Sequence, residues 1–255
     1  MQVNKIMIEP RTNQQKKAVA ITQPCLFPYL GYYQLVFAST NFVFYDDITF
    51  MKGKWINRNR ILANGRQLMF SLPLAHMSPN TLISETFINK NSFDSWKDKF
   101  LKTLMHSYSK APYRDEALNL VYKVLHCGSY SITDLCHESI ALVFQYMNID
   151  IDISRSSLLP ADLPRLTRVG RLVHIVKWYN SSIYINSAGG RLLYNPTQFD
   201  EHQIELMFLE SDLPEYSQSS RSDHKFVPSL SIIDILMHCS ADQMRQLMVC
   251  YRLGK

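Results

Sequence analysis

The stretch that decides the fold lies near the start of the chain, at residues 18–45: AVAITQPCLFPYLGYYQLVFASTNFVFY. Residues 18–22 form a short apolar run that predicts a buried strand. The two prolines in residues 23–28 are incompatible with a helix and indicate an extended loop. Residues 29–39 carry apolar side chains at helical spacing, and residues 42–45 are rich in β-forming residues. The order strand, loop, helix, strand predicts a βαβ unit with parallel strands.

A similar alternation of strands and helices returns later in the chain. Further strands are expected at residues 67–74, 82–88, 149–153, 182–186 and 204–209. Helices are expected at residues 92–108, 113–126, 131–147, 167–180, 231–238 and 241–251. Three segments are expected to be irregular: a hairpin-like or irregular stretch at 46–64, a tight turn at 187–190 and a polar loop at 211–228. The sequence therefore predicts an α/β protein with a three-layer, Rossmann-like, mostly parallel sheet.

The domain organisation follows from the same pattern. Residues 1–17 are polar and are expected to form a flexible lead. Residues 18–255 are expected to form a single α/β domain, because 255 residues suit one large domain. The three consecutive helices between residues 92 and 148 predict a helical insertion or subdomain within that domain.

The composition is that of a folded protein rather than a disordered one. Of the 255 residues, 46% are apolar and 19% are charged, so the chain can bury a sizeable core. The net charge is only +5, and the basic residues are spread along the chain except at residues 52–60. A protein that binds nucleic acid usually gathers its basic residues on one face. We therefore expect no nucleic-acid partner, and residues 52–60 suit a phosphorylated small molecule at least as well as a polymer.

The cysteines and the hydropathy predict a cytoplasmic protein. The five cysteines are odd in number and none are spaced as C-x-x-C, which argues against a disulfide framework or a structural zinc site. Reduced thiols in the cytosol account for them most simply. No apolar run approaches the roughly 20 residues that a membrane-spanning helix needs. Residues 1–17 also lack the apolar segment of a signal peptide.

The loop at residues 23–28 is the first candidate site. It follows the first expected strand, and ligands of open α/β sheets gather at the carboxyl ends of strands. Gln23 would lie at the strand tip, and the helix start near Tyr29 would offer free backbone N–H groups to an anion. The alternative is a rigid turn with a buried cysteine. Cys25 itself is expected to be a structural thiol rather than a nucleophile, because no base that would activate it can be identified.

The second candidate site follows the second expected strand. Asp46 and Asp47 stand at the strand end, where a carboxylate can hold a divalent ion or the hydroxyl groups of a sugar. A dense group of basic, amide and aromatic residues comes next. Its members are Lys52, Trp55, Asn57, Arg58, Asn59 and Arg60. Arginine binds phosphate in a bidentate manner, and tryptophan stacks on a base or sugar, so this segment predicts a binding site. The alternative is a solvated basic loop.

Three weaker candidates lie in the second half of the chain. Arg168 and Arg171 follow the expected N-cap Thr167. Ser187 begins a Ser-Ala-Gly-Gly turn that would let a ligand approach the backbone or would simply reverse the chain. Ser231 and Asp234 stand at the start of a helix, where capping is the default role and ligand contact the alternative. The histidines form no metal-binding pattern, and no metal site is predicted. His224, in the long polar loop, is the histidine best placed for acid–base chemistry.

Several of these stretches together resemble the WbqC-like family. Residues 21–33, ITQPCLFPYLGYY, are similar to its opening pattern Ile-x-Gln-Pro-x-aromatic-Leu-Pro-aromatic-Leu-Gly-Tyr-aromatic. Residues 42–48, FVFYDDI, and residues 52–61, KGKWINRNRI, continue the resemblance. Further matches occur at residues 111–113, 184–190 and 226–236, so the likeness runs along most of the chain. Two departures are a Leu-Phe pair at residues 26–27, where aromatic-Leu is usual, and Ser-Ala-Gly-Gly at 187–190 in place of a Ser-Gly loop.

The resemblance implies a place in the biosynthesis of bacterial surface polysaccharides such as O-antigen. It suggests that the protein makes or modifies a nucleotide-linked sugar, for example by acyl or aminoacyl transfer to an amino sugar. The opening of the chain is also similar in layout to nucleotidylyltransferases. Those enzymes carry a His-x-Gly-His motif at the helix start, whereas residues 27–32 here read FPYLGY. Adenylyl transfer is therefore not expected, because the groups that stabilise its transition state are missing.

Two main hypotheses follow. In the first, the protein is a transferase whose arginines at 58 and 60 hold phosphates, whose asparagines at 57 and 59 orient the sugar, and whose aspartates or His224 move protons. An acyl or aminoacyl donor, or a carrier protein, would be its second partner. In the second, the protein binds a ligand or partner of the same pathway without catalysis, since no nucleophile–base pair is recognisable. RNA binding through residues 52–60 is a weaker third hypothesis, and the sequence identifies no cofactor.

Overall fold

A six-stranded sheet forms the centre of the protein. The computed structural model describes residues 17–160, 166–218 and 225–255. Within them the strand order is β5-β2-β1-β6-β7-β8, and every neighbouring pair is parallel except β7 and β8. The strands are β1 (Ala18–Thr22), β2 (Asn41–Phe44), β5 (Ile153–Arg155), β6 (Ile183–Ser187), β7 (Glu205–Ser211) and β8 (Tyr251–Gly254). The predicted α/β fold with a mostly parallel sheet is confirmed.

The βαβ unit predicted at the start of the chain is present. The helix α1 (Leu30–Ala38) joins β1 to β2, and the two strands are parallel, with Val19 opposite Asn41 and Thr22 opposite Phe44. The apolar residues of β1 are buried on both faces of the sheet, as expected for a central parallel strand. The carboxyl end of β1 leads directly into the loop at residues 23–28, so that loop lies at the edge of the sheet where ligands gather.

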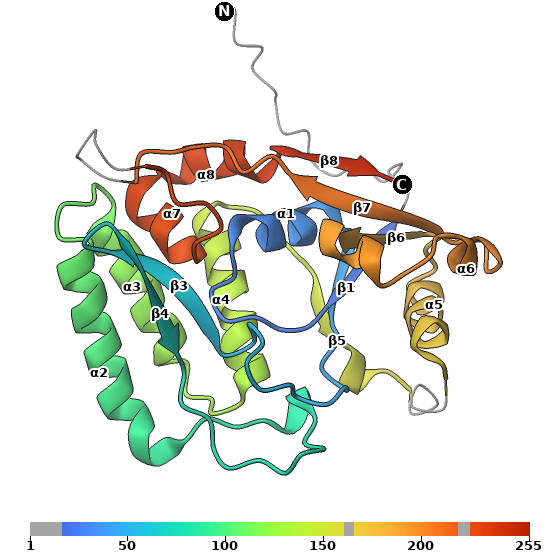
Figure 1. The fold of residues 1–255 in the computed structure, drawn as a ribbon, viewed down its shortest axis with the longest axis horizontal. Coiled ribbons are helices and arrows are strands. Elements are labelled where there is room, and N and C mark those ends of the chain that lie inside the picture. The colour runs from blue at the N-terminus through green and yellow to red at the C-terminus, as the bar shows by residue number, and fades with distance from the viewer. Residues whose placement is uncertain (1–16, 161–165, 219–224) are drawn as a thin grey trace, which may run out of the picture.

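Helices flank the sheet on both faces. Val19 and Ile21 of β1 pack into an apolar cluster with the helices α5 (Arg168–Trp178) and α6 (Thr197–Asp200). Ala20, which points to the opposite face, belongs to a larger cluster that includes α1 and α4 (Ile132–Tyr146). Figure 1 shows α5 and α6 on one side of the sheet and α4 on the other. The alternation of side chains along one strand therefore serves two separate apolar layers.

The helices expected in the middle of the chain are also present. They are α2 (Lys90–Ser107), α3 (Arg114–Leu125) and α4, and they share the larger apolar cluster with the sheet. Beside them lies an antiparallel hairpin of β3 (Arg58–Ala63) and β4 (Arg66–Ser71). Its turn consists of Asn64 and Gly65, which both have a positive φ, 51° and 72°. The strand β3 falls within the segment that was predicted to be hairpin-like or irregular.

Several element boundaries differ from the sequence predictions. The expected strand at 82–88 is instead a short 3-10 helix, η1 (Ile83–Glu85), with isolated bridges on either side of it. The turn expected at 187–190 falls largely within another 3-10 helix, η4 (Ala188–Leu192), and β5 begins at residue 153 rather than 149. The helix α7 (Ile232–His238) is as predicted, whereas α8 (Ala241–Met248) ends early and β8 follows it. Pairing with β7 creates β8, and local sequence does not encode that non-local contact.

The backbone of Phe27 ties the loop at residues 23–28 to two distant elements. Its carbonyl oxygen accepts hydrogen bonds from Asn59 Nδ2 on β3, at 2.8 Å, and from Ser231 Oγ before α7, at 2.7 Å. Its amide donates to Ser139 Oγ on α4 at 3.2 Å. Phe27 is fully buried and has a φ of 45°, a backbone conformation that bulky residues rarely adopt. The three contacts together hold this strained residue in place.

We predict that Ser231→Ala lowers the free energy of unfolding by about 1–3 kcal/mol, because it removes a buried hydrogen bond to Phe27 as well as the N-cap of α7. Urea unfolding followed by circular dichroism measures the change. Ser240→Ala is the matched control, since Ser240 caps α8 in the same way and makes no other side-chain bond among the described residues. It is expected to cost about 1 kcal/mol. Equal losses in the two variants would contradict a role for the Phe27 contact.

Candidate functional site

Two cavities meet at the carboxyl ends of β1 and β6. One, of about 460 Å³, opens toward the hairpin and α1, and we call it the hairpin-side cavity. The other, of about 490 Å³, opens toward α5, and we call it the α5-side cavity. Thr22, Gln23 and Ser187 line both of them. We call the two cavities together the β1–β6 cleft.

The cleft lies where the order of the strands reverses. The chain leaves β1 for α1 on one face of the sheet, whereas it leaves β6 for η4 and α6 on the other face. Connections that diverge in this way leave an open crevice between the strand ends. In open α/β sheets such a switch point is the usual place for a ligand.

Basic side chains line both cavities. Lys54 and Arg60 line the hairpin-side cavity, and Arg168 and Arg171 line the α5-side cavity. No aspartate or glutamate is among the described residues that line either one. A concave surface with charge of one sign raises the local concentration of ligands of the opposite sign. The lining of the cleft is therefore positively charged, which favours an anionic ligand over a cationic one.

The indole ring of Trp55, which lines the hairpin-side cavity, contacts two guanidinium groups. Arg58 Cζ is 5.6 Å from the centre of the Trp55 ring, and Arg60 Cζ is 5.1 Å from it. Arg60 also donates a hydrogen bond through Nη1 to Gln67 Oε1 at 2.8 Å. The Trp55 side chain is 46% exposed, so part of the ring is free for a ligand. The two cations orient the ring and add positive charge around it.

Tyr29 contributes a second exposed ring to the same cavity. It is the residue before α1, and Gly31 in the first turn of that helix lies against it. A Cβ at Gly31 would come within 2.6 Å of Tyr29 Cε2, so a larger residue would displace the ring. The glycine of the Leu-Gly-Tyr sequence, Gly31, is therefore required because the Tyr29 ring lies close to the helix backbone at this position.

The first turn of α5 lines the α5-side cavity. Thr167 caps this helix, because its Oγ1 accepts a hydrogen bond from the Gly170 amide at 3.1 Å. Arg168 lies over the Tyr194 ring and Arg171 over the Tyr45 ring, at 5.5 and 5.1 Å. Free N–H groups and the helix dipole make such a helix start favourable for an anion, and the two arginines reinforce that preference.

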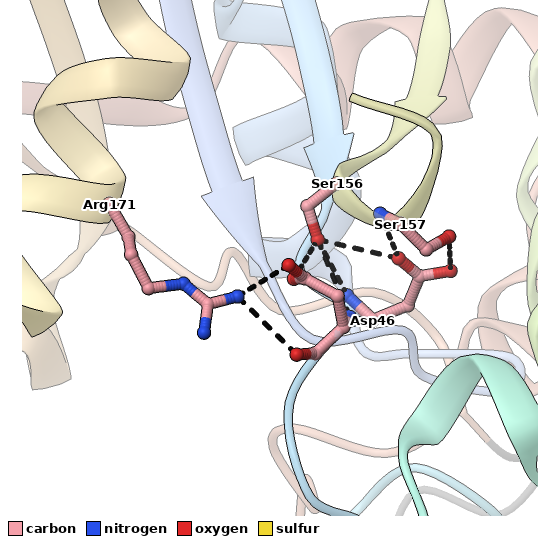
Figure 2. Close-up of polar contacts among 5 residues, drawn as sticks. Asp46, Ser156, Ser157 and Arg171 are labelled. Carbon is pink, nitrogen blue, oxygen red and sulfur yellow. Dashed lines mark hydrogen bonds and ion pairs between the residues drawn. The ribbon is translucent and has the colours of Figure 1, made fainter. Parts of the chain in front are cut away.

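The two adjacent aspartates that follow β2 hold this wall together (Figure 2). Asp47 forms an ion pair with Arg171 and accepts a hydrogen bond from Ser156 Oγ. The Asp46 carboxylate accepts hydrogen bonds from the amide and the hydroxyl of Ser157, both at 2.9 Å. Burial raises the pKa of Asp46, although the bonds from Ser157 lower it. Neither aspartate lines the cleft, and both link the end of β2 to the segment after β5.

Three polar side chains line the cleft and each has a donor or acceptor group with no hydrogen-bond partner among the described residues. Among the described residues, the Gln23 side chain and the Ser187 hydroxyl make no hydrogen bond, since only the backbone of each is engaged. The Asn186 amide oxygen accepts from the Ser187 amide at 2.8 Å, whereas its Nδ2 has no described acceptor. Asn186 lies against Gly190, where an added Cβ would be 2.5 Å from Nδ2. These groups are available to orient a ligand.

The structure brings together some of the predicted site residues and separates others. Gln23, Trp55, Asn59, Arg60, Arg171 and Ser187 line the cleft. Asn59 nevertheless donates a hydrogen bond from its side-chain amide to the Phe27 carbonyl, and Asn57 donates one to the Leu72 carbonyl at 2.9 Å. Both side chains therefore help to hold the hairpin in place. Arg58 reaches the Trp55 ring but does not line either cavity, and Lys52 lies on a different hollow beside Met77. His224 lies outside the described residues.

Some other residues that line the cleft were not predicted from the sequence. Lys54 stands two residues after Lys52 in the same segment, and Gly53 between them has a φ of 82° that redirects the chain. Tyr32 and Asn186 were not among the site residues predicted from the sequence. The feature that could have identified them is their closeness to Gln23 and Ser187, which stand at strand ends.

Ser231 and Asp234 are parts of the fold rather than of the cleft. Ser231 is fully buried and bonded to Phe27. Asp234 is also fully buried, and its two carboxylate oxygens accept hydrogen bonds from Tyr108 Oη at 2.8 Å and from Tyr216 Oη at 2.7 Å. Burial raises the pKa of the Asp234 carboxyl, while the tyrosine bonds and His238 lower it.

The cysteine of the loop is a structural thiol. Cys25 Sγ donates a hydrogen bond to the Trp55 carbonyl at 3.0 Å, and burial raises the pKa of the thiol to about 12. The thiolate that nucleophilic catalysis requires is therefore not populated near neutral pH. All five cysteines are free, and no group of three or more potential His, Cys, Asp or Glu ligands for a metal ion occurs in the described part of the chain. No described helix is both long and apolar enough to cross a membrane.

Fold and site together define an α/β protein with a basic cleft at the switch point of a mostly parallel sheet. Comparison with known proteins then identifies the family. The chain belongs to the WbqC-like protein family, whose model matches residues 23–246. It is also similar to an uncharacterized protein of Mycobacterium tuberculosis, with 24% identity over 237 residues that cover 92% of this chain and 99% of the relative. No solved structure matches the chain.

We predict that the stability of the wild type relative to Asp234→Asn falls as the pH rises. The pKa of Asp234 in the folded state is above its ordinary value of 3.8, so folding favours the protonated carboxyl. That stabilisation is complete below the unfolded-state pKa and is lost as the pH rises through the folded-state pKa. Urea unfolding of both proteins at several pH values from about 3 to 8 measures the difference. Asp98→Asn, on the exposed face of α2, controls for loss of one charge, and a difference that stays constant with pH would contradict the prediction.

Proposed function

We propose that the β1–β6 cleft binds a nucleotide-linked sugar, or another phosphorylated small molecule, and that the protein is a transferase acting on such a sugar. One observation carries the proposal. The two cavities that meet at the switch point are lined by four basic side chains and, among the described residues, by no carboxylate. Phosphate groups carry the charge that such a surface selects, and aromatic rings such as Trp55 suit a base or a sugar face.

Membership of the WbqC-like family supports a setting for this activity. We propose bacterial surface-polysaccharide (O-antigen) biosynthesis, with acyl or aminoacyl transfer to a nucleotide-linked amino sugar. The same proposal has three further parts. The three-layer sheet would resemble that of nucleotidylyltransferases, and the protein would be cytoplasmic. The chain would form a single domain with a helical insertion at residues 92–148.

The arginines of α5 are the best placed to hold phosphates. Arg168 and Arg171 line the α5-side cavity at a helix start, whereas Arg58 does not line the cleft and Arg60 shares its guanidinium with Gln67. Asp47 would act on the ligand through Arg171, whose guanidinium it orients. Gln23 would orient the sugar or the transferred group at the strand tip, where its amide is available.

The transfer also needs a proton acceptor. The amine nitrogen of the sugar would form a bond to the carbonyl carbon of the donor, the bond from that carbon to its carrier would break, and the amine would lose a proton. The described lining of the cleft contains neither histidine nor carboxylate. Catalytic roles for Asp46, Asp47 and His224 therefore stay predictions. The same feature favours a second candidate function, a protein that binds a ligand or partner of the pathway without catalysis.

We predict that uridine diphosphate N-acetylglucosamine binds the purified protein and that Arg168→Gln weakens binding about tenfold, because a charge-assisted contact contributes about 1.5–3 kcal/mol. Isothermal titration calorimetry measures the affinity. Lys177→Gln is the matched control, since it removes a positive charge from the last turn of the same helix, outside the cleft. Absence of binding to this and to other nucleoside diphosphate sugars, or equal weakening in both variants, would contradict the proposal.

A mixing experiment separates the transferase from the binder. The protein is incubated with a uridine diphosphate amino sugar and acetyl-coenzyme A or another acyl donor, and the sugar is then weighed by mass spectrometry. A transferase raises the mass of the sugar by that of the acyl group, and Gln23→Ala slows this while leaving the fold intact. Binding of the sugar without any mass change, across a panel of acyl and aminoacyl donors, would favour the non-catalytic role.

A further inference from the structure

We propose that the two cavities of the β1–β6 cleft are separate anion subsites that hold two molecules at once. The α5-side cavity would take the diphosphate of the nucleotide-linked sugar. The hairpin-side cavity would take a second, anionic ligand with an apolar part, such as a phosphate-bearing acyl donor. The inference rests on the proposed function and adds to it a distinct place for the second substrate.

The distribution of charge is the first argument. The residues common to both cavities, Thr22, Gln23 and Ser187, are all neutral. The basic residues instead form one pair on each side, Lys54 with Arg60 and Arg168 with Arg171, and no pair lines both cavities. A single ligand with one central diphosphate, laid across the sheet edge, would place its charge over the neutral junction. Two ligands, each with its anionic group held on its own side, match the charges.

The position of the cavities is the second argument. The hairpin-side cavity is built from residues of the larger apolar cluster, such as Leu35 and Ile56, whereas the α5-side cavity contains Leu172 and Tyr184 of the other cluster. The two subsites therefore lie on opposite faces of the sheet. Each has the volume of a small-molecule site on its own, about 460 and 490 Å³, within the usual range of roughly 300–1,000 Å³.

The residues that line the two cavities differ, and this difference indicates which ligand each cavity would bind. The α5-side cavity combines Arg168 and Arg171 with a helix start and with the backbone of residues 189–190, a combination suited to a diphosphate. The hairpin-side cavity is lined by Lys54 and Arg60, by apolar and aromatic residues that include Pro24 and Trp55, and by neutral polar residues. A ligand with one anionic group and an apolar arm satisfies both features of that wall.

The junction suits the uncharged ends of two such ligands. Gln23 and Ser187 offer neutral donors and acceptors there, and among the described residues neither side chain is engaged elsewhere. A carbonyl or an amine held at this point needs hydrogen bonds rather than charge. The arrangement would bring the reacting groups together while it keeps the two anionic groups apart, which limits their mutual repulsion.

Calorimetric titration with inorganic pyrophosphate tests this inference directly. We expect two sites per chain in the wild type. Arg168→Gln should weaken one of them about tenfold and leave the other unchanged, and Lys54→Ala should do the same to the other site. The double variant should weaken both sites to the same extent. Lys52→Ala and Lys177→Gln remove charges from the same two segments outside the cleft, and both should keep two unchanged sites.

A competition experiment completes the test. With the protein saturated with uridine diphosphate, pyrophosphate should still bind at one site, and Lys54→Ala should weaken that remaining binding about tenfold. A single pyrophosphate site that both variants weaken, or complete competition by uridine diphosphate, would overturn the two-subsite inference and leave the proposed function standing. If neither pyrophosphate nor uridine diphosphate binds, the anionic cleft and the proposed function fail together. Circular dichroism confirms that each variant is folded.

Discussion

The carbonyl of Phe27 is the point on which the rest of the structure depends. It receives hydrogen bonds from β3 and from the start of α7, and these are separated from it by 32 and 204 residues of sequence. The loop that carries this carbonyl also supplies Gln23 to the tip of β1. A buried carbonyl without partners would cost free energy, so the loop, the hairpin and α7 assemble as one unit. The shape of the hairpin-side cavity follows from that assembly, because β3 carries Arg60 into it.

A second polar junction does the same on the other side of the cleft. Asp47 binds Arg171 and Ser156, and thereby connects the end of β2, the segment after β5 and the helix α5. The ion pair is mostly buried, with 14% of each side chain exposed. Such a pair contributes more to specificity of position than to stability, because desolvation offsets much of the attraction. It leaves Arg171 with a fixed direction, and a fixed cation binds an anion without the entropic cost of ordering a free side chain.

The sequence predicted the sheet well and the site only in outline. Strands such as β1 were recognisable because burial on both faces leaves an uninterrupted apolar run. The strand β8 was not, because residues 251–254 pair with β7 through contacts that no local pattern records. In the cleft, Gln23 and Arg171 were found by their place at strand and helix ends. Lys54 was missed in favour of Lys52, because only the turn at Gly53 decides which lysine faces the cavity.

The most distinctive polar residues of the sequence turn out to be largely engaged within the protein. Asn57, Asn59, Ser231 and Asp234 all make buried or partly buried hydrogen bonds that hold elements together. These polar residues are therefore concentrated in the sequence because they hold a hairpin and a helix against a strained loop. The groups left for a ligand are those with no such task, above all the Gln23 side chain and the Ser187 hydroxyl. In the proposed site, the dense polar segment therefore supports the cleft, and its less conspicuous neighbours are the residues that would contact the ligand.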